Sequence, residues 1–266
     1  MSEFPFADLL PVGVCRFADL ADGLLPCRAA SRLPKNAASV IVYLFPYWLG
    51  DEAYRGANVS KYAVPADYHT VAGDYLARAA AALKERWPDH AFEPFCDNSP
   101  LPEARAAMLA GLGAKGRNGL LLNETYGSFC FIGEIVTDRV FSAYDGPLKT
   151  CLNCGRCERA CPTGALHDGA VDKTLCLSDV SQRKTEPTPE QRELMRQTGC
   201  VWGCDVCQDV CPVNRDLPVT PVPEFRESAR AVFHAGDPVE GRAYAWRGRA
   251  VIDRNAAYTG EPSEKE

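Results

Sequence analysis

A run of four closely spaced cysteines constrains this chain more than any other feature. Residues 151–162 read Cys-Leu-Asn-Cys-Gly-Arg-Cys-Glu-Arg-Ala-Cys-Pro, which is the pattern C-x2-C-x2-C-x3-C-P. With this spacing, three thiolates hold one iron–sulfur cube and the fourth crosses to a second cube. Zinc sites usually use two separated pairs of ligands, so the triple spacing favours iron.

A second cysteine group repeats half of the first. Residues 204–212 read Cys-Asp-Val-Cys-Gln-Asp-Val-Cys-Pro, and Cys200 precedes them. Two [4Fe–4S] clusters need eight thiolates, and nine cysteines lie between residues 151 and 211. The crossing rule predicts one set of Cys151, Cys154, Cys157 and Cys211, and a second set of Cys161, Cys204, Cys207 and either Cys176 or Cys200. The ninth cysteine is expected to be a small buried apolar residue.

The composition fits a soluble globular protein. The 266 residues are 46% hydrophobic and 24% charged, which excludes a disordered or fibrous chain. The thirteen cysteines are an odd number, and the first residues lack the basic and apolar regions of a signal peptide, so we expect a reducing cytoplasm. The longest apolar run, 40–49, is interrupted by Pro46 and is too short to span a membrane. A net charge of −6 argues against nucleic-acid binding by electrostatics alone.

The first half of the chain predicts a mixed α+β fold. β-branched and aromatic residues predict strands over 12–17, 39–47 and 91–96, and helical spacing predicts helices over 67–87 and 102–110. Segments 119–123 and 129–137 are expected to pair as a hairpin.

Two polar or glycine-rich sites in this half have alternative interpretations. Gly111, Gly113 and Gly116 match the G-x-G-x-x-G pattern, but a helix precedes them and a strand follows, which is the reverse of a dinucleotide site. They indicate either a tight turn or close approach of the backbone to a flat ligand. Asp97 ends a strand, where it is either a turn residue or a general acid whose pKa is raised by partial burial.

Several blocks in order resemble the epoxyqueuosine reductases. They are Ser60-Lys61-Tyr62-Ala63 with Asp67-Tyr68-His69, Pro94 to Pro100, Ala110 to Asn118, Gly127 to Glu134, and the cysteine runs that end in Cys211-Pro212-Val213-Asn214. The resemblance covers about residues 12 to 216.

The resemblance implies an N-terminal reductase-like α/β sandwich that binds a corrinoid (cobalamin), followed by a two-[4Fe–4S] ferredoxin-like domain. The implied activity is reduction of the epoxide of epoxyqueuosine in tRNA to queuosine, with Asp97 as the acid. Cys176 is then preferred to Cys200 as the eighth cluster ligand. The residues implied at the corrinoid are Ser60, Tyr62, Tyr68, His69, Gly111, Gly113, Gly116, Arg117 and Asn118.

The expected domains are 1–148 for corrinoid binding, 149–216 for the clusters, and 217–266 as a partly helical extension with a polar tail. Residues 242–257 resemble the opening helix of the helical repeat domain that many family members carry, so we expect a short form without that domain. Two alternatives remain open: a related corrinoid or iron–sulfur reductase that acts on a small molecule, and a ferredoxin-like electron carrier. The electron donor is not identified by the sequence.

Overall fold

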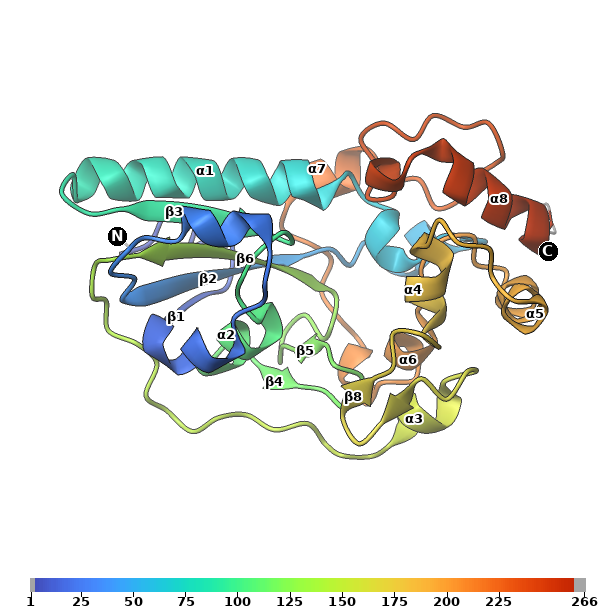
Figure 1. The fold of residues 1–266 in the computed structure, drawn as a ribbon, viewed down its shortest axis with the longest axis horizontal. Coiled ribbons are helices and arrows are strands. Elements are labelled where there is room, and N and C mark those ends of the chain that lie inside the picture. The colour runs from blue at the N-terminus through green and yellow to red at the C-terminus, as the bar shows by residue number, and fades with distance from the viewer. Residues whose placement is uncertain (1–2, 261–266) are drawn as a thin grey trace. The chain divides into compact units, whose positions relative to one another are not determined.

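The computed structural model describes residues 3–260, and these form two compact units. Unit 1 takes the chain up to Pro46, then His69–Gly116 and Leu120–Leu152. Unit 2 takes Tyr47–Tyr68, Arg117–Gly119 and the chain from Asn153 onward. Each unit is therefore built from segments that are distant in sequence (Figure 1).

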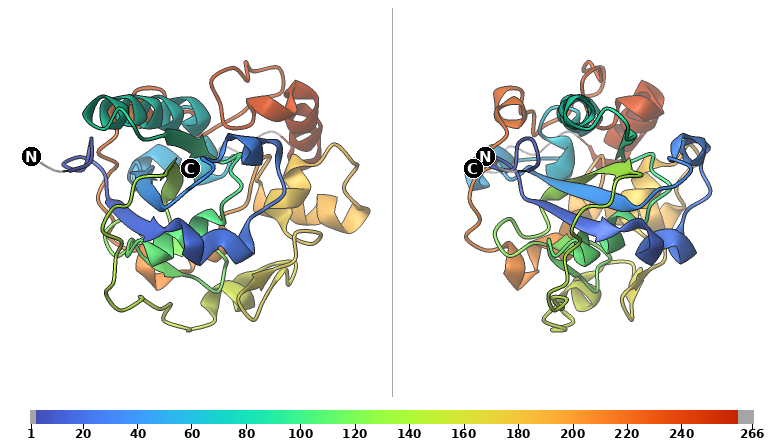
Figure 2. Two further views of the ribbon diagram at one scale, coloured as in Figure 1. Left: turned by 60° about the vertical axis from the view of Figure 1, so that its left-hand side comes forward. Right: turned by 90° about the vertical axis from the view of Figure 1, so that its left-hand side faces the viewer.

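Unit 1 is built on an antiparallel sheet in the order β1-β2-β6-β3. Its strands are β1 (Val12–Arg16), β2 (Ser39–Pro46), β6 (Cys130–Thr137) and β3 (Phe92–Cys96). Helix α1 (Tyr68–Arg86) lies along one face and the shorter α2 (Glu103–Leu109) lies on the other (Figures 1 and 2). Every residue of β2 is buried, since the strand is covered on both faces. The predicted strands and both predicted helices are confirmed.

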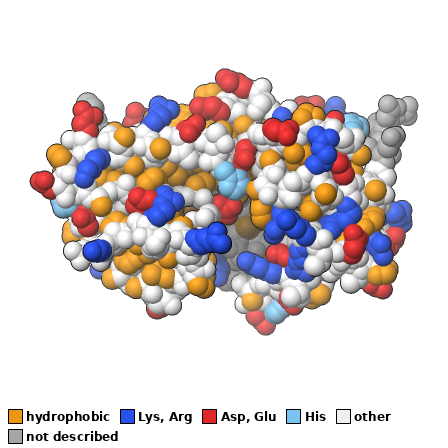
Figure 3. All heavy atoms as spheres, turned by 45° about the horizontal axis from the view of Figure 1, so that its top comes forward, with side chains coloured by type: hydrophobic (Ala, Val, Ile, Leu, Met, Phe, Trp, Pro, Cys, Tyr) orange, Lys and Arg blue, Asp and Glu red, His pale blue; other side chains and the backbone are white. Residues whose placement is uncertain are grey.

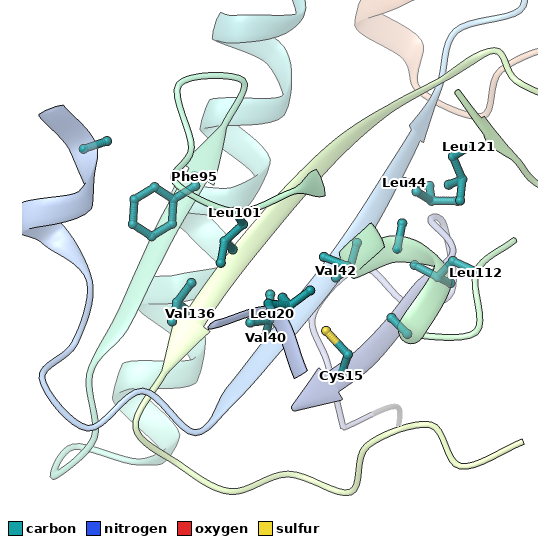
Figure 4. Close-up of a cluster of buried hydrophobic side chains, with 14 residues drawn as sticks. Cys15, Leu20, Val40, Val42, Leu44, Phe95, Leu101, Leu112, Leu121 and Val136 are labelled. Atoms are coloured by element: carbon teal, nitrogen blue, oxygen red, sulfur yellow. The ribbon is translucent and has the colours of Figure 1, made fainter. Parts of the chain in front are cut away.

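The core of unit 1 on the α2 side follows the alternation of β2. Val40, Val42 and Leu44 point to this side and pack with Leu20, Phe95 and the alanines of α2 (Figure 4). The intervening β2 residues face α1, where the Phe45 and Tyr75 rings meet edge to face. Alternate residues of this one strand, which are β-branched or aromatic, thus pack on the two opposite faces of the sheet.

The predicted hairpin is wrong. Strand β5 (Leu121–Leu122) pairs with β4 (Ala114–Lys115), while β6 pairs with β2 and β3. Two features explain this. Strand β6 lies between β2 and β3, where the backbone groups along both of its edges are hydrogen-bonded, and the side chain of Asn123 ties its turn to the carbonyl of Leu112.

One glycine of the Gly111–Gly116 loop is required by close packing within unit 1. A Cβ on Gly113 would lie 2.4 Å from the carbonyl oxygen of Leu122. We therefore expect Gly113→Ala to lower the free energy of unfolding by about 1–3 kcal/mol in urea titrations. Gly73→Ala is the control, because a Cβ on Gly73 in α1 meets nothing within 4 Å, and alanine there should raise stability by up to about 1 kcal/mol. Equal stability of the two variants would contradict this explanation.

Unit 2 holds short elements around a compact apolar cluster. They are α3 (Arg156–Ala160), β7 (Leu166–His167), β8 (Ala170–Val171), α4 (Leu177–Gln182), α5 (Pro189–Thr198), α6 (Val206–Asp209), α7 (Pro223–Glu227) and α8 (Arg249–Thr259). The cluster joins Val59 and Val64 to Trp202, Tyr244 and Ile252. The segment 242–257 therefore contributes α8 to the core of unit 2.

Two buried asparagines bind this unit together. The side chain of Asn58 donates to the carbonyl of Phe233 and accepts from its N–H, and Asn255 in α8 donates to the carbonyls of Ser181 and Val201. Both side chains are almost inaccessible to solvent, so these hydrogen bonds replace lost water contacts. Among the described residues no helix is long and apolar enough to cross a membrane.

Candidate functional site

The two cysteine runs of unit 2 fold alike. In the first run, Asn153 adopts a left-handed conformation, α3 follows, and the N–H of Cys161 donates back to the carbonyl of Glu158. In the second, Gly203 is left-handed, α6 follows, and the N–H of Cys211 donates to the carbonyl of Gln208. Helices α3 and α6 contact each other. The repeated sequence therefore gives a repeated local structure.

Four thiols of the predicted second set are neighbours. Burial raises the pKa of Cys204 to about 11, and the nearby thiolates Cys176 and Cys161 act in the same direction. Burial likewise raises the pKa of Cys207 to about 12, with Cys204, Cys176 and, from the first set, Cys157 close by. Thiols with such pKa values are protonated at neutral pH. Iron binds the thiolate form, so cluster assembly releases these protons. This donor set fits a [4Fe–4S] cluster.

Cys200 is also a neighbour of Cys204, but its thiol has another partner. Its Sγ donates to the carbonyl oxygen of Trp202 at 3.1 Å, and burial raises its pKa. In the described part of the chain, no three His, Cys, Asp or Glu side chains converge as they do on a single metal ion. That finding is compatible with cubes, in which each thiolate binds a different iron.

Residues 58–62 lie beside the second cysteine run. Val59 and Trp202 form a parallel bridge, the N–H of Ser60 donates to the carbonyl of Trp202, and the Tyr62 hydroxyl accepts from the indole of Trp202 at 2.6 Å. A Cβ on Gly203 would lie 2.3 Å from the Cβ of Ser60, so glycine is needed at this crossing.

Polar groups of the same segment hold the loop of the second run. The hydroxyl of Ser60 and the N–H of Lys61 donate to the two carboxylate oxygens of Asp205, and the Lys61 ammonium contacts Asp209 at 2.6 Å. Because Asp205 is buried, these donors satisfy a carboxylate that would otherwise be costly. Ser60 and Tyr62, which the resemblance placed at the corrinoid, thus support a cysteine run within unit 2.

Arg117 supports the first cysteine run in the same way. Its guanidinium makes two hydrogen bonds, of 2.9 and 2.8 Å, to the carboxylate of Glu158 in α3, which lies between Cys157 and Cys161. Asn118 is buried in this unit and Tyr68 packs against its core.

The three glycines of the predicted corrinoid loop belong to unit 1. Gly111 has φ +77°, and a Cβ there would lie 2.6 Å from the ring of Tyr144. The N–H of Gly116 donates to the carbonyl of Leu120. The packing of unit 1 is therefore enough to explain why Gly111 and Gly113 are glycines. These two glycines are no separate evidence for a corrinoid, which is inferred from the sequence relationship.

The structure brings Asp97 and His69 together in unit 1. Asp97 directly follows β3 in a left-handed conformation with φ +61°, which Asp tolerates better than most residues. Its Oδ2 lies 2.9 Å from Nε2 of His69 at the start of α1. The Asp97 side chain is 56% exposed. The exposed carboxyl and its imidazole partner form a pair that can hold a transferable proton.

Two carboxyls that the sequence reasoning missed lie near this pair. Glu134 in β6 is fully buried and accepts from the Ser99 hydroxyl at 2.8 Å, and burial raises its pKa to about 8. Burial also raises the pKa of Glu103, and the charges of Glu134 and Asp97 add to the effect. The sequence does mark Glu134, because it is the one charged residue in the predicted strand 129–137.

Comparison with known proteins assigns both parts of the chain. Residues 150–214 match the family model for a 4Fe-4S double cluster binding domain, and residues 28–98 match that of epoxyqueuosine reductase QueG, DUF1730. The region 150–214 is therefore a double [4Fe–4S] cluster domain, as the spacing predicted.

Relatives of known name agree with these matches. The epoxyqueuosine reductase of Cyclobacterium marinum is 38% identical over 190 residues, which are 69% of this chain and 61% of that protein. The chain spans about half to three fifths of the length of the curated relatives it matches.

Solved structures show the same fold. The epoxyqueuosine reductase of Streptococcus thermophilus has a TM-score of 0.78 at 23% identity, over 93% of this chain and 76% of that one. An epoxyqueuosine reductase solved with an epoxyqueuosine-modified tRNA stem loop also has a TM-score of 0.78 at 23% identity, over 95% and 78%. The expected fold class is thereby confirmed.

Proposed function

We propose, on the premise that this chain is a relative of the epoxyqueuosine reductases, that it reduces an epoxide to an alkene with electrons delivered through two [4Fe–4S] clusters. The observation that carries the proposal is the presence, in one chain, of the double-cluster domain and the QueG-type region that contains Asp97. An electron carrier needs only the first of these parts.

The cluster ligands that we propose are two crossed sets. Cys151, Cys154, Cys157 and Cys211 form the first, and Cys161, Cys176, Cys204 and Cys207 form the second. The mutual proximity of the thiols in the second set and the engagement of Cys200 with Trp202 support this choice. Lys61 and Arg117 secure the two loops through carboxylates next to the ligands.

A corrinoid is the second cofactor of the proposal, on the strength of the sequence relationship. When bound, it supplies a strongly reducing nucleophile for an epoxide carbon. The residues proposed to contact it are Ser60, Tyr62, Tyr68, His69, Gly111, Gly113, Gly116, Arg117 and Asn118. Of these, the backbone around the glycines and the ring of His69 belong to unit 1 with Asp97.

Asp97 is proposed to protonate the oxygen that leaves the substrate carbon. The contact with His69 orients this carboxyl, and its exposure lets a substrate reach it.

We propose epoxyqueuosine in tRNA as the substrate, since a related reductase was solved with such a tRNA stem loop. Figure 3 shows Lys and Arg side chains interspersed with acidic ones over the face in view. With a net charge of −6, local groups of cations must provide the phosphate contacts. We therefore expect binding to weaken steeply as salt is raised.

Anaerobic reconstitution tests the proposal. The chain should take up about eight iron atoms and one corrinoid, and it should convert epoxyqueuosine-containing tRNA to queuosine-containing tRNA with a chemical reductant. Clusters without corrinoid uptake or turnover would instead identify an electron carrier. Corrinoid uptake with reduction of the free epoxide but not of the tRNA would indicate a small-molecule reductase.

A further inference from the structure

Two buried carboxyl groups in unit 1 have no role in the function proposed so far. Glu134 is completely buried in β6, and Glu103 begins α2. In the described part of the chain, Oε1 of each residue is buried and has no hydrogen-bond partner. Unsatisfied buried oxygens reduce stability, so packing alone does not explain two of them in one place.

The surroundings of the pair are acidic. The titratable groups that face it are Asp97 in the loop after β3, Cys15 on β1, and each carboxyl of the pair itself. Among residues 3–260, no basic side chain forms an ion pair with either Glu103 or Glu134. Two adjacent buried carboxyls without a cation cannot both ionise at neutral pH, so the pair retains a proton.

The pair is connected to the loop that carries Asp97. The backbone N–H of Asp97 donates to the Glu103 carboxyl. Ser99, two residues further along, donates its hydroxyl to Oε2 of Glu134 and accepts the N–H of Leu101. The loop 97–101 is thus hydrogen-bonded to both carboxyls of the pair.

The proposed reaction needs two protons. Reduction of an epoxide to an alkene breaks two C–O bonds, forms one C=C bond, consumes two electrons, and releases the oxygen as water with two protons. The electrons come from the external reductant through the clusters. Asp97 can hold only one proton, so the second must come from another group.

We propose that the Glu103–Glu134 pair stores the second proton and supplies it to Asp97 within each turnover. This inference rests on the proposed epoxide reduction. Because the carboxyl oxygens of both glutamates are buried, both act through Asp97 and its loop.

Glu134→Gln tests the role of the pair. Glutamine keeps the size of the side chain and its carbonyl oxygen can still accept from Ser99, but it holds no transferable acid proton. With the clusters and corrinoid loaded, we expect kcat to fall at least about tenfold with KM nearly unchanged. The wild-type rate should decline as the pH rises through about 8, and that decline should be absent in the variant. Glu85→Gln, at an exposed position of α1, is the control and should match the wild type.

Infrared spectroscopy measures the stored proton without turnover. At pH 7 the wild type should show the C=O band of a protonated carboxyl, which shifts in D2O and disappears above about pH 8. The band should change in Glu134→Gln and be absent from a Glu103→Gln/Glu134→Gln double variant whose circular dichroism is native.

The two proposals can fail separately. If the wild type reduces the epoxide but Glu134→Gln has the same kcat and pH profile, or the band is absent at pH 7, the proton store is rejected while the proposed function stands. If the band is present but the loaded wild type reduces no epoxide, the proposed function is rejected, and the supply step with it.

Discussion

Cys176→Ser is expected to lower the iron content of the reconstituted chain from about eight atoms towards four and to abolish turnover, whereas Cys200→Ser leaves both unchanged. The two cysteines are matched candidates for the same position in the second cluster. Cys176 precedes α4 and is an electrostatic neighbour of Cys204 and Cys207. Cys200 also lies near Cys204, but it is not a neighbour of Cys207 in the same way, and its Sγ donates to the carbonyl of Trp202.

The large effect of Cys176→Ser follows from the ligand count. A serine hydroxyl is a weak ligand for iron at neutral pH, so a cube with three thiolates should be lost or become labile. Iron analysis and electron paramagnetic resonance of the dithionite-reduced chain measure the outcome. If Cys176→Ser keeps about eight iron atoms and Cys200→Ser loses iron, then Cys200 and not Cys176 is the ligand of the second cluster.

Asp97→Asn is expected to reduce the rate of epoxide reduction by about 10²- to 10⁴-fold with iron and corrinoid contents intact. The amide keeps the size of the side chain and can still contact His69, but it cannot donate an acid proton to the leaving oxygen. Single-turnover kinetics with reduced enzyme isolate this step from electron delivery.

Asp138→Asn is the matched control for Asp97→Asn. Asp138 follows β6, contacts the ring of His90 at 3.1 Å and accepts the N–H of Ala91, so it is also a strand-end aspartate paired with a histidine in unit 1. It should retain nearly full activity. A similar loss in both variants would indicate a structural effect, and full activity of Asp97→Asn would make Asp97 a turn residue.

Features that depend on residues close together in the sequence, such as single strands, helices and the cysteine runs, could be predicted from it. The cysteine spacing identified the cluster domain, and the apolar runs of β2 and α1 located these elements to within one or two residues. Periodicity determines such elements because each is stabilised mainly by one buried face. The helix that precedes the glycine loop was also predictable, and it excluded a dinucleotide fingerprint.

Features that depend on distant residues were not predictable. The pairing of β6 with β2 and β3 replaced the expected hairpin because hydrogen bonding along both edges of β6 outweighs a short turn. The hydrogen bond of Ser60 to Asp205 in the second cysteine run joins residues that are far apart in the sequence. The Glu103–Glu134 pair joins a helix to a strand, and neither residue alone indicates that the other is near.

The discontinuity of unit 2 has a consequence for its synthesis on the ribosome. Its apolar cluster joins Val59 and Val64 to Tyr244 and Ile252. Unit 2 therefore cannot complete its core until the ribosome has synthesised the chain as far as Ile252. At usual translation rates this delay is roughly ten to forty seconds. The cysteines of both runs are made before the apolar cluster of unit 2 is complete, and they remain open to oxidation during that interval. We therefore expect cluster assembly to depend on factors that protect or load nascent thiols, and an isolated fragment of the cysteine runs to bind iron poorly.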